Sequence, residues 1–451
     1  MKFGIFYEHQ LPRPWDTNAE LALIRDALDQ VELADRLGIE YLWEVEHHFL
    51  EEYSHSSAPE VFLAAASQRT ENIRLGHGII QTAPGYNHPV RTAERVATLD
   101  LVSGGRVEFG SGESSSEAEL GGFGIEVFTK REQWREGLEV AIRCLTEEPF
   151  TGYAGEYVSV PPRNVVPKPV QRPHPPLWVA CSRRDTILLA AELGIGALTF
   201  AFIDPEEARG WLTDYQSVLA ERCVPIGKAV NPQVACVTPM MCHPDERRAI
   251  EMGLEGGNFF GYSLAHYYVF GEHRPARTNV WEEFIQRRDA MGYSPEAAIA
   301  AEQETLGAKI AAGDNTGLRG AVGTPEQIRE FLRRYEEAGV DQLIFVMQAG
   351  RNRHEDIMES LERFGTEILP EFKERDEKAA AAKARRWEPL IEQAMLRKAD
   401  DAPEMPADYV MKAYPKQMID RAGNEDGQQF LDRFANEQAA GSRDSDLGIL
   451  G

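Results

Sequence analysis

The stretch "ELALIRDALDQVELADRLGIEYLWEVE" at residues 20–46 contains one complete helix-to-strand unit. Its first part carries apolar residues at helical spacing and ends at Gly38, a residue type that commonly terminates helices. Its second part, "EYLWEVE" (40–46), is short, mostly apolar and rich in aromatic and β-branched residues, which is typical of a buried strand. The stretch therefore predicts a helix over 19–37 followed by a strand over 40–46.

The same alternation of strand and helix recurs along most of the chain. Further strands are predicted at 2–8, 73–81, 106–113, 177–182, 196–202, 232–242 and 342–348, and helices at 59–70, 89–102, 130–147, 184–193, 205–222, 324–339 and 353–372. Because most of these strands are nearly all apolar, they indicate a parallel sheet buried on both faces. We therefore expect an α/β fold, a (β/α)8 TIM barrel with insertions over residues 1–372. A doubly wound open sheet is the alternative, but no G-x-G-x-x-G follows the first strand.

Two regions fall outside the alternation. The first is an insertion near 256–320, whose first half is dense in aromatic residues and glycine. Long loops over a barrel mouth often act as lids, so we expect a lid over a substrate pocket, although simple packing against the barrel is nearly as good an interpretation. The candidate substrate and lid residues are Tyr262, His266, Tyr267, Tyr268 and Phe270. The second region, 373–451, is expected to form a C-terminal helical and extended arm against the barrel or a partner subunit.

Composition narrows the class of protein. The net charge of −25 argues against a nucleic-acid partner or an anionic membrane surface, since both require clustered Lys and Arg. The five cysteines are sparse, odd in number and never spaced C-x-x-C, which favours a reducing cytoplasm. The N-terminus has no apolar signal-peptide region, and the apolar stretch 188–203 is interrupted by Glu192, Gly194 and Gly196. We therefore expect a cytoplasmic protein.

Polar residues follow several predicted strands directly, and barrel active sites gather at those strand ends. The residues expected to meet there are Glu46, His47, His48, Gly78, Gly112, Glu113, Ser114, Ser115, Ser116, Cys181, Ser182, Arg183, Arg184 and Gln348. Neighbouring residues on a strand point to opposite faces, so His47 and His48 are poorly placed to chelate one ion. H-E-x-x-H and an EF-hand loop are both absent. We predict no metal site, and solvated strand-end residues remain an alternative interpretation.

Two of these strand ends have features that suit an anion. The turn "GSGESSSEAEL" (110–120) offers backbone amides and hydroxyls of the kind that bind phosphate. In "ACSRRDT" (180–186), Ser182 is expected to cap a helix N-terminus, where anions bind, and two arginines follow it. A plain loop and an ordinary cap with surface arginines are the alternatives for each taken alone. Together, on adjacent strands, they favour a cofactor that carries a phosphate.

Five segments in order carry a resemblance to a known family. They are "MKFGIFYE" (1–8), "EHHF" (46–49), "HPVRTAERVATLDLVSGGRVEFGSG" (88–112), "VGTPEQIREFL" (322–332) and "HEDIMESLERFGTEILPEF" (354–372). With these segments the chain resembles the bacterial luciferase-like flavin-dependent monooxygenases over residues 1–372. The resemblance implies bound FMN, with its ring in the barrel mouth and its phosphate beside the loops after the fourth and fifth strands.

The resemblance also implies roles for individual residues. His47 would act in catalysis at the reactive edge of the flavin, with His48 as a partner behind it or on the substrate side. A non-proline cis peptide near Gly78–Ile79 would support the ring. The other implied cofactor-binding residues are Gly112, Glu113, Ser114, Ser115, Ala180, Cys181, Ser182, Arg183 and Arg184. Glu113 stands where bacterial luciferase has an arginine beside the phosphate, so Arg183 or Arg184, together with the serines, would have to replace that contact.

The implied reaction uses reduced FMN, supplied by a separate NAD(P)H flavin reductase, and dioxygen as co-substrate. A flavin hydroperoxide would then oxygenate a small, hydrophobic organic substrate, while the protein orients it and excludes water. A homodimer is expected. Three alternatives stay open: a deazaflavin-dependent oxidoreductase on the same barrel that transfers hydride, a non-catalytic flavin-binding protein, and a metal-dependent barrel hydrolase.

Overall fold

The computed structural model describes residues 1–199, 205–288, 319–399 and 403–439. By its internal contacts the chain divides into two units, Met1–Asp401 and Ala402–Gly451. The second unit contains the helices α15 (Tyr414–Ala422) and α16 (Glu425–Ala439). None of the described helices combines the length and the apolar character needed to cross a membrane.

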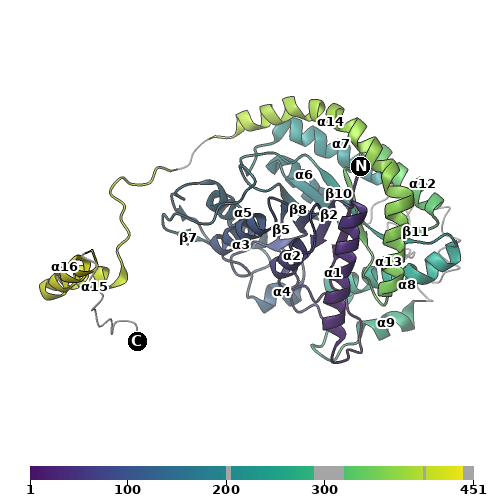
Figure 1. The fold of residues 1–451 in the computed structure, drawn as a ribbon, viewed down its shortest axis with the longest axis horizontal. Coiled ribbons are helices and arrows are strands. Elements are labelled where there is room, and N and C mark those ends of the chain that lie inside the picture. The colour runs from purple at the N-terminus through teal and green to yellow at the C-terminus, as the bar shows by residue number, and fades with distance from the viewer. Residues whose placement is uncertain (200–204, 289–318, 400–402, 440–451) are drawn as a thin grey trace. The chain divides into compact units, whose positions relative to one another are not determined.

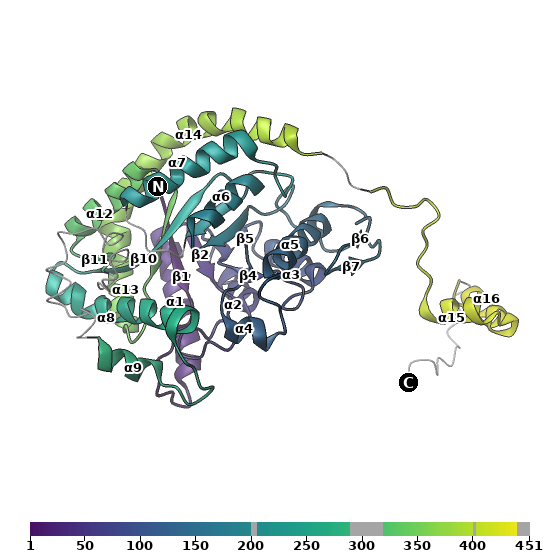
Figure 2. The same cartoon turned by 180° about the vertical axis from the view of Figure 1, so that it is seen from behind.

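Eight parallel strands of the first unit form a closed barrel in the described part of the chain. They are β1 (Lys2–Tyr7), β2 (Tyr41–Glu44), β3 (Arg74–His77), β5 (Val107–Gly112), β8 (Leu177–Cys181), β9 (Gly196–Thr199), β10 (Val234–Cys242) and β12 (Gln342–Val346). The barrel closes because β12 pairs with β1 on one side and with β10 on the other. The predicted TIM barrel is therefore confirmed (Figures 1 and 2).

Helices cover the outside of the barrel (Figure 1). They are α1 (Ala19–Leu37), α2 (Pro59–Ser67), α3 (Pro89–Val102), α5 (Lys130–Thr146), α6 (Arg184–Leu193), α7 (Pro205–Arg222), α12 (Pro325–Ala338) and α13 (His354–Arg363). Gly38 ends α1 at a φ of 86°, a left-handed conformation that glycine adopts without a steric penalty. The N-terminus of α12 has a capping box, in which the Thr324 and Gln327 side chains accept from each other's backbone amides.

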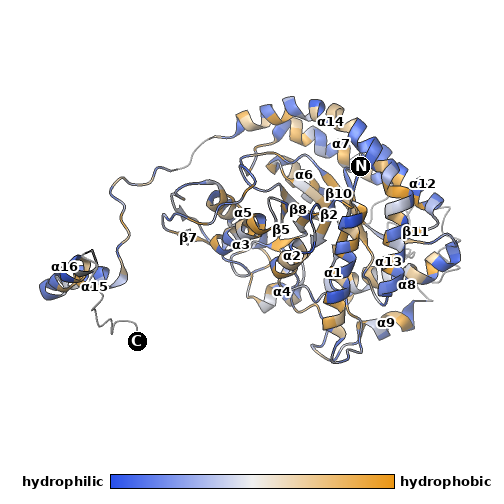
Figure 3. Ribbon diagram, in the orientation of Figure 1, coloured by the Kyte–Doolittle hydropathy of each residue, from blue (hydrophilic) through white to orange (hydrophobic). Residues whose placement is uncertain are grey.

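The strands are buried on both faces, and Figure 3 shows them largely in the colour of hydrophobic residues. One apolar cluster lies between the strands and the helices, and a second fills the barrel itself. In the second cluster the rings of Trp43 and Trp178 meet edge to face at 5.3 Å. Space for these rings comes from Gly76 and Gly196, where an added Cβ would lie 2.2 Å and 2.4 Å from indole atoms. The interior is thus a packed core, and chemistry is confined to the mouth.

The structure differs from the predicted elements in several places. The strand expected at 73–81 is two strands, β3 and β4 (Ile80–Gln81), separated at Gly78–Ile79. Every cis peptide bond of the described residues precedes a proline, so the expected cis bond at Gly78–Ile79 is wrong. A short helix, α4 (Glu117–Gly122), and a hairpin of β6 (Tyr153–Ala154) and β7 (Ser159–Val160) were not expected.

The insertion begins later than predicted. Residue 256 falls inside α8 (Glu246–Ala265), a single helix capped by the Asp245 side chain. After it come η1 (His266–Phe270), α9 (Val280–Arg287) and, beyond residues 289–318, β11 (Ala321–Gly323). The second half of the predicted lid lies outside the described residues.

The C-terminal boundary of the barrel also lies elsewhere in the structure. The expected boundary at 372/373 falls inside α14 (Leu369–Arg397), which continues from α13 through η3 (Phe364–Ile368). Helix α14 runs along α7 on the outside of the barrel (Figures 1 and 2). The first part of the predicted arm is therefore a helix of the barrel unit itself.

Candidate active site

The loop that follows β2 holds His47 at the mouth of the barrel. The His47 amide donates to the carbonyl of Ser56 at 2.7 Å. The Ser56 hydroxyl in turn donates to the Val45 carbonyl at 2.7 Å and to the buried carboxylate of Glu44. These contacts fix the path of the loop over residues 45–56, and with it the position of the His47 ring.

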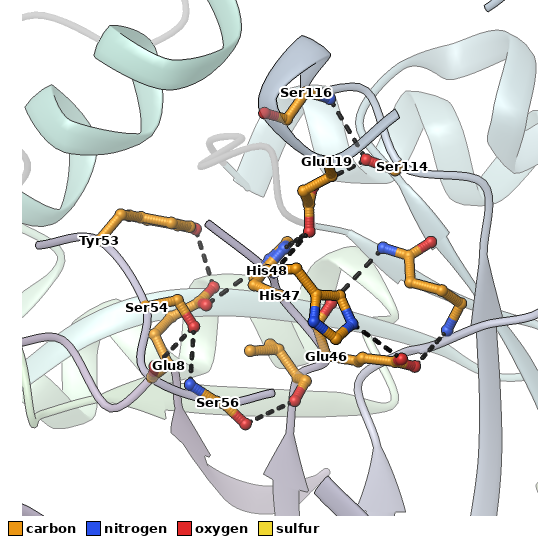
Figure 4. A network of polar contacts seen from close by, with 12 residues as sticks. Glu8, Glu46, His47, His48, Tyr53, Ser54, Ser56, Ser114, Ser116 and Glu119 are labelled. Atoms are coloured by element: carbon orange, nitrogen blue, oxygen red, sulfur yellow. Dashed lines mark hydrogen bonds and ion pairs between the residues drawn. The ribbon is translucent and has the colours of Figure 1, made fainter. Parts of the chain in front are cut away.

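Two buried carboxylates flank the His47 ring (Figure 4). Glu119 of α4 lies with Oε1 3.0 Å from Nδ1, and Glu8, directly after β1, lies with Oε2 3.6 Å from Nε2. The side chains of both glutamates are at most 1% exposed, whereas that of His47 is 15% exposed. Two ring nitrogens of one imidazole thus face two different acids at the point where the barrel opens.

The electrostatics of this group follow from burial and charge. Burial alone would lower the pKa of His47, but the charges of Glu119 and Glu8 outweigh it and raise that pKa to about 9. Burial raises the pKa of Glu8 to about 7, although His47 and the Tyr53 hydroxyl counteract it. Burial acts on Glu119 in the same direction, yet His47 and hydrogen bonds hold its pKa below the usual range. At neutral pH the site therefore contains an imidazolium against an ionised Glu119.

His48 takes a different direction from its neighbour. Its Nε2 lies 3.1 Å from Oε1 of Glu46. That carboxylate also accepts from the Gln81 amide at 2.7 Å and from the Asn87 side chain at 2.8 Å. The side chains of the two adjacent histidines thus bind separate carboxylates, although both residues lie in the loop after β2 rather than on the strand itself.

The predicted lid residues differ in how close they lie to His47. The Tyr268 hydroxyl reaches the site, 3.4 Å from Nδ1 of His47 and 3.5 Å from Oε2 of Glu119. The rings of Tyr262 and Phe270 pack together at 5.5 Å, and His266 lies buried 3.5 Å from Glu283. Tyr267 packs between these groups, with its ring 6.4 Å from that of Tyr53 and 4.9 Å from that of His273. Among the five, the structure brings Tyr268 to His47, while the others pack within the insertion or along its border.

Two cations that the strand-end rule missed contact the loop after β5. Arg131 donates to Glu113 at 2.9 Å, and Lys130 donates to the Ser114 carbonyl and to the Ser115 hydroxyl at 3.4 Å. Both cations lie in the first turn of α5 rather than at a strand end, and the unexpected helix α4 lies between that turn and β5 in the chain. The segment "TKRE" (129–132) at a predicted helix start was the available signal.

Ser114 does not offer its hydroxyl to a ligand in this arrangement. It adopts a φ of 54°, and its Oγ donates to Oε2 of Glu119 at 2.8 Å. The glycines nearby serve packing, since a Cβ on Gly112 would lie 2.6 Å from the Ile79 side chain and one on Gly78 would lie 3.3 Å from Trp43. The backbone of the loop thus comes close to the barrel interior at these positions.

The loop after β8 exposes both of its arginines to solvent. The residue that caps α6 is Arg183, not Ser182, because the Thr186 amide bonds to the Arg183 carbonyl and the helix begins one residue later than that prediction requires. Arg183 pairs with Asp185 at 3.1 Å and Arg184 with Asp214, and both arginine side chains are more than half exposed. Ala180 packs against the barrel interior, whereas Cys181 is fully buried.

The chemistry of these donors fits a phosphate. Lys130, Arg131 and Arg183 stand around the carboxylates of Glu113 and Asp185, with Arg131 linking the two loops through a 3.9 Å contact to Asp185. Burial lowers the pKa of Lys130, the charge of Glu113 counteracts it in part, and the charges of Arg131 and Arg183 act in the same direction as burial. Cations that crowd one another in this way favour an anion between them. Among the described residues, no group of three or more His, Cys, Asp or Glu side chains is placed to hold a metal ion.

The structure is thus a closed (β/α)8 barrel whose mouth holds a histidine between two buried acids and, beside it, a group of cations. Residues 1–342 match the sequence model of the luciferase-like monooxygenases. The match covers well over half of the 451 residues, and the chain belongs to this family.

Two curated relatives illustrate the similarity. An uncharacterized protein of Sinorhizobium fredii, y4wF, is 34% identical over 194 residues, which cover 43% of this chain and 54% of that protein. The chain thus spans about half the length of that relative. The oxygenase component of flavin-dependent trigonelline monooxygenase from Acinetobacter baylyi is 25% identical over 381 residues, 83% of this chain and 96% of that protein.

Solved structures share the fold at lower identity. Monooxygenase RslO1 of Streptomyces bottropensis has a TM-score of 0.64 and 24% identity, over 82% of this chain and 100% of that one. The oxygenating constituent of 3,6-diketocamphane monooxygenase of Pseudomonas putida, solved with FMN, has a TM-score of 0.61 and 21% identity over 82% and 98%. The coenzyme-F420-dependent tetrahydromethanopterin reductase of Methanopyrus kandleri has a TM-score of 0.55 and 22% identity over 82% and 99%. At these identities the likeness concerns the fold alone.

Proposed function

We propose that the protein is a flavin-dependent monooxygenase that uses reduced FMN and dioxygen to oxygenate a small organic substrate. The observation that carries this proposal is the alignment with an oxygenase component over 96% of that relative's length. The site supports the proposal independently, because it combines a group able to hold a proton with a separate cluster able to hold a phosphate.

The residues that would hold the FMN phosphate are Lys130, Arg131, Arg183 and Ser115. Glu113, which departs from the arginine of bacterial luciferase, accepts from Nε and Nη2 of Arg131 and so orients that guanidinium. An acid at position 113 is compatible with phosphate binding for this reason, since the charge it cannot supply comes from α5. Arg184 takes no part in this proposal because Asp214 holds it away on α7.

The chain's own groups manage protons and exclude water. Reduced FMN, when bound, supplies the electrons that activate dioxygen and so allows one oxygen atom to enter the substrate. His47 holds a proton on each ring nitrogen at neutral pH and is the group we assign to proton donation at the mouth. The rings of Tyr53 and Tyr268 pack beside His47 and shield it from solvent. A small, largely apolar substrate suits the aromatic lining that these rings provide.

The proposal includes a separate NAD(P)H flavin reductase that supplies reduced FMN. Support comes from the relative of Acinetobacter baylyi, which is described as an oxygenase component. The same proposal places the protein in the cytoplasm as a homodimer. Sedimentation of the purified chain measures its oligomeric state. A deazaflavin-dependent reaction is the competing candidate, since one of the structures that share the fold belongs to a coenzyme-F420-dependent reductase.

Rapid mixing tests the proposal without knowledge of the substrate. The purified chain is equilibrated with reduced FMN in the absence of oxygen and then mixed with oxygenated buffer while the flavin absorbance is followed. We expect tight binding of reduced FMN and a return of oxidised flavin that is delayed relative to free flavin. Absence of reduced FMN binding, together with retention of reduced coenzyme F420, would replace this proposal by the deazaflavin alternative.

A further inference from the structure

Glu119 makes more contacts in the site than its partner carboxylate. Its Oε1 accepts from Nδ1 of His47 and from the His48 amide, each at 3.0 Å, and its Oε2 accepts from Ser114 at 2.8 Å. Tyr268 approaches the same Oε2 at 3.5 Å. The side chain is fully buried, so these donors replace the water that an ionised carboxylate would otherwise require.

Glu8 on the other side of the ring is held loosely by comparison. Its Oε1 accepts from the Tyr53 hydroxyl at 2.8 Å, while Oε2, the atom nearest to His47, has no hydrogen-bond partner among the described residues. The 3.6 Å separation between Oε2 and Nε2 is longer than a hydrogen bond. The ring is therefore anchored at Nδ1 and left free to exchange a proton at Nε2.

We propose that Glu119 is the positioning residue of His47: its carboxylate binds the Nδ1–H and so leaves the Nε2–H on the side of Glu8. This assignment rests on the proposed function for its role in turnover. It assigns a role to α4, because that helix precedes Lys130 and Arg131 in the chain and carries the acid that orients the histidine. It also connects the insertion to the site, since Tyr268 reaches the same carboxylate.

The neighbours of His47 bear out the asymmetry between its two nitrogens. The groups that face the ring are Glu8 from the end of β1, Glu46 and Tyr53 from the loop after β2, Glu119 from α4, and Tyr268 from η1. Of the three acids, Glu119 lies within hydrogen-bond distance of the ring. A carboxylate that binds one ring nitrogen of a histidine determines which tautomer the neutral ring adopts.

Nuclear magnetic resonance of histidine ring nitrogens measures both consequences in the full chain. The protein is labelled with ¹⁵N in its histidine rings, kept free of flavin, and titrated from about pH 5 to about pH 10, a range that brackets histidine ionisation. The variant His47→Gln assigns the signals of His47. Glu119→Gln keeps a carbonyl that can accept the Nδ1–H but removes the charge, whereas Glu119→Ala removes both.

We expect the wild-type ring to titrate near pH 9 and its neutral form to keep the proton on Nδ1. In Glu119→Gln the midpoint should fall by about one pH unit or more, because an adjacent opposite charge is lost, while the Nδ1–H tautomer persists. In Glu119→Ala the midpoint should fall similarly and the Nδ1–H tautomer should be lost. Glu117→Gln, an exposed acid in the same helix, should change neither property.

An unchanged midpoint in Glu119→Gln, or an unchanged tautomer in Glu119→Ala, would overturn the proposal. Glu119→Gln alone decides the question if the alanine variant does not fold. Because no flavin, oxygen or substrate enters the measurement, failure of FMN to bind would refute the proposed function and leave this assignment intact. Conversely, an unchanged titration would refute this assignment and leave the proposed function standing.

Discussion

The lower interior of the barrel and its mouth each contain a buried glutamate, and the two differ in how well they are bound. Glu108 of β5 accepts from the indole of Trp178 at 2.6 Å and pairs with the Arg74 guanidinium. Glu8 at the mouth has one donor, Tyr53, and an oxygen without a partner that faces His47. Both lie in closely packed surroundings, so burial itself is not what separates them.

This difference separates stabilising polar groups from functional ones. A buried acid with its donors in place adds rigidity to a core, whereas one that lacks a donor costs stability and persists where the site uses it. Burial raises the pKa of Glu8 to about 7, close to a working pH, and a proton can therefore leave or return there. Under the proposed function, the unpartnered oxygen of Glu8 marks the mouth as the part of the barrel that exchanges protons.

The largest expected effect concerns His47. Its replacement in His47→Asn should slow the proton-dependent phase of flavin reoxidation by about 10²-fold or more, because general acids contribute factors of that size. Stopped-flow absorbance after mixing the reduced complex with oxygen measures that phase. The control is His88→Asn, which changes an exposed histidine whose N-cap role at α3 asparagine can also perform. Equal rates in wild type and His47→Asn would place the proton donor elsewhere.

The second effect compares the two glutamates directly. Glu108→Gln should lower the free energy of unfolding by about 1.5–3 kcal/mol, since it removes a charged acceptor from both an indole and a guanidinium. Glu8→Gln should cost less, because no donor bonds to Oε2 and Tyr53 can still donate to the amide carbonyl. Urea unfolding followed by tryptophan fluorescence gives both values. A larger loss in Glu8→Gln would reverse the comparison.

The third effect is a pH dependence of stability that arises at the mouth. The folded-state pKa of His47 is about 9, above its ordinary 6.5, so its stabilisation is present below pH 6.5 and lost as the pH rises to about 9. The loss should be on the order of 2 kcal/mol, since each unit of pKa difference corresponds to about 1.4 kcal/mol and Glu8 shares part of the effect. Glu8 adds a further loss of stability as the pH rises from its ordinary pKa of 4.5 to its folded-state pKa of about 7, because burial raises that pKa too.

Unfolding curves at three pH values distinguish these contributions. Wild type should lose stability steadily from pH 5 to pH 9, and His47→Asn should lose little between pH 7 and pH 9. Glu8→Gln should remove the loss of stability that wild type shows below pH 7. If His47→Asn kept the full loss above pH 7, another group would be responsible for it.

The smallest expected effect concerns the insertion. Tyr268→Phe removes a hydroxyl that lies 3.4–3.5 Å from His47 and Glu119, distances at the outer limit of a hydrogen bond. The reoxidation phase should therefore slow by about fivefold at most, corresponding to about 1 kcal/mol. Tyr262→Phe, in a ring that packs within the insertion, is the matched control. A loss as large as that of His47→Asn would make Tyr268 a proton donor in its own right.

Much of the barrel could be predicted because its signals are local. A strand is indicated by an apolar run of a few residues, and a helix end by a nearby residue such as Gly38, so each signal lies within a short stretch of sequence. The elements that were missed have weak local signals. The helix α4 spans six residues rich in glycine and acid, and the division of 73–81 into β3 and β4 depends on how Gly78 packs against Trp43.

The site could be predicted in part for the same reason. The rule that strand ends meet at the barrel mouth led to His47, His48 and the serine-rich loop. Applied to the first strand, it would also have found Glu8. Glu119, Lys130 and Arg131 follow no strand directly, so their arrival at the mouth depends on the turn of the chain between β5 and α5.

The sequence by itself determined the alternation of elements, hence the barrel, and the end of the barrel at which polar groups collect. Only the tertiary structure decided which acids meet His47, because Glu8 and Glu119 are separated from it by 39 and 72 residues and are brought together by strand pairing and by α4. The physical reason is the distance along the chain over which each signal acts. Periodicity and caps act between neighbours in the chain, whereas the charge on an imidazole depends on groups that are neighbours in space.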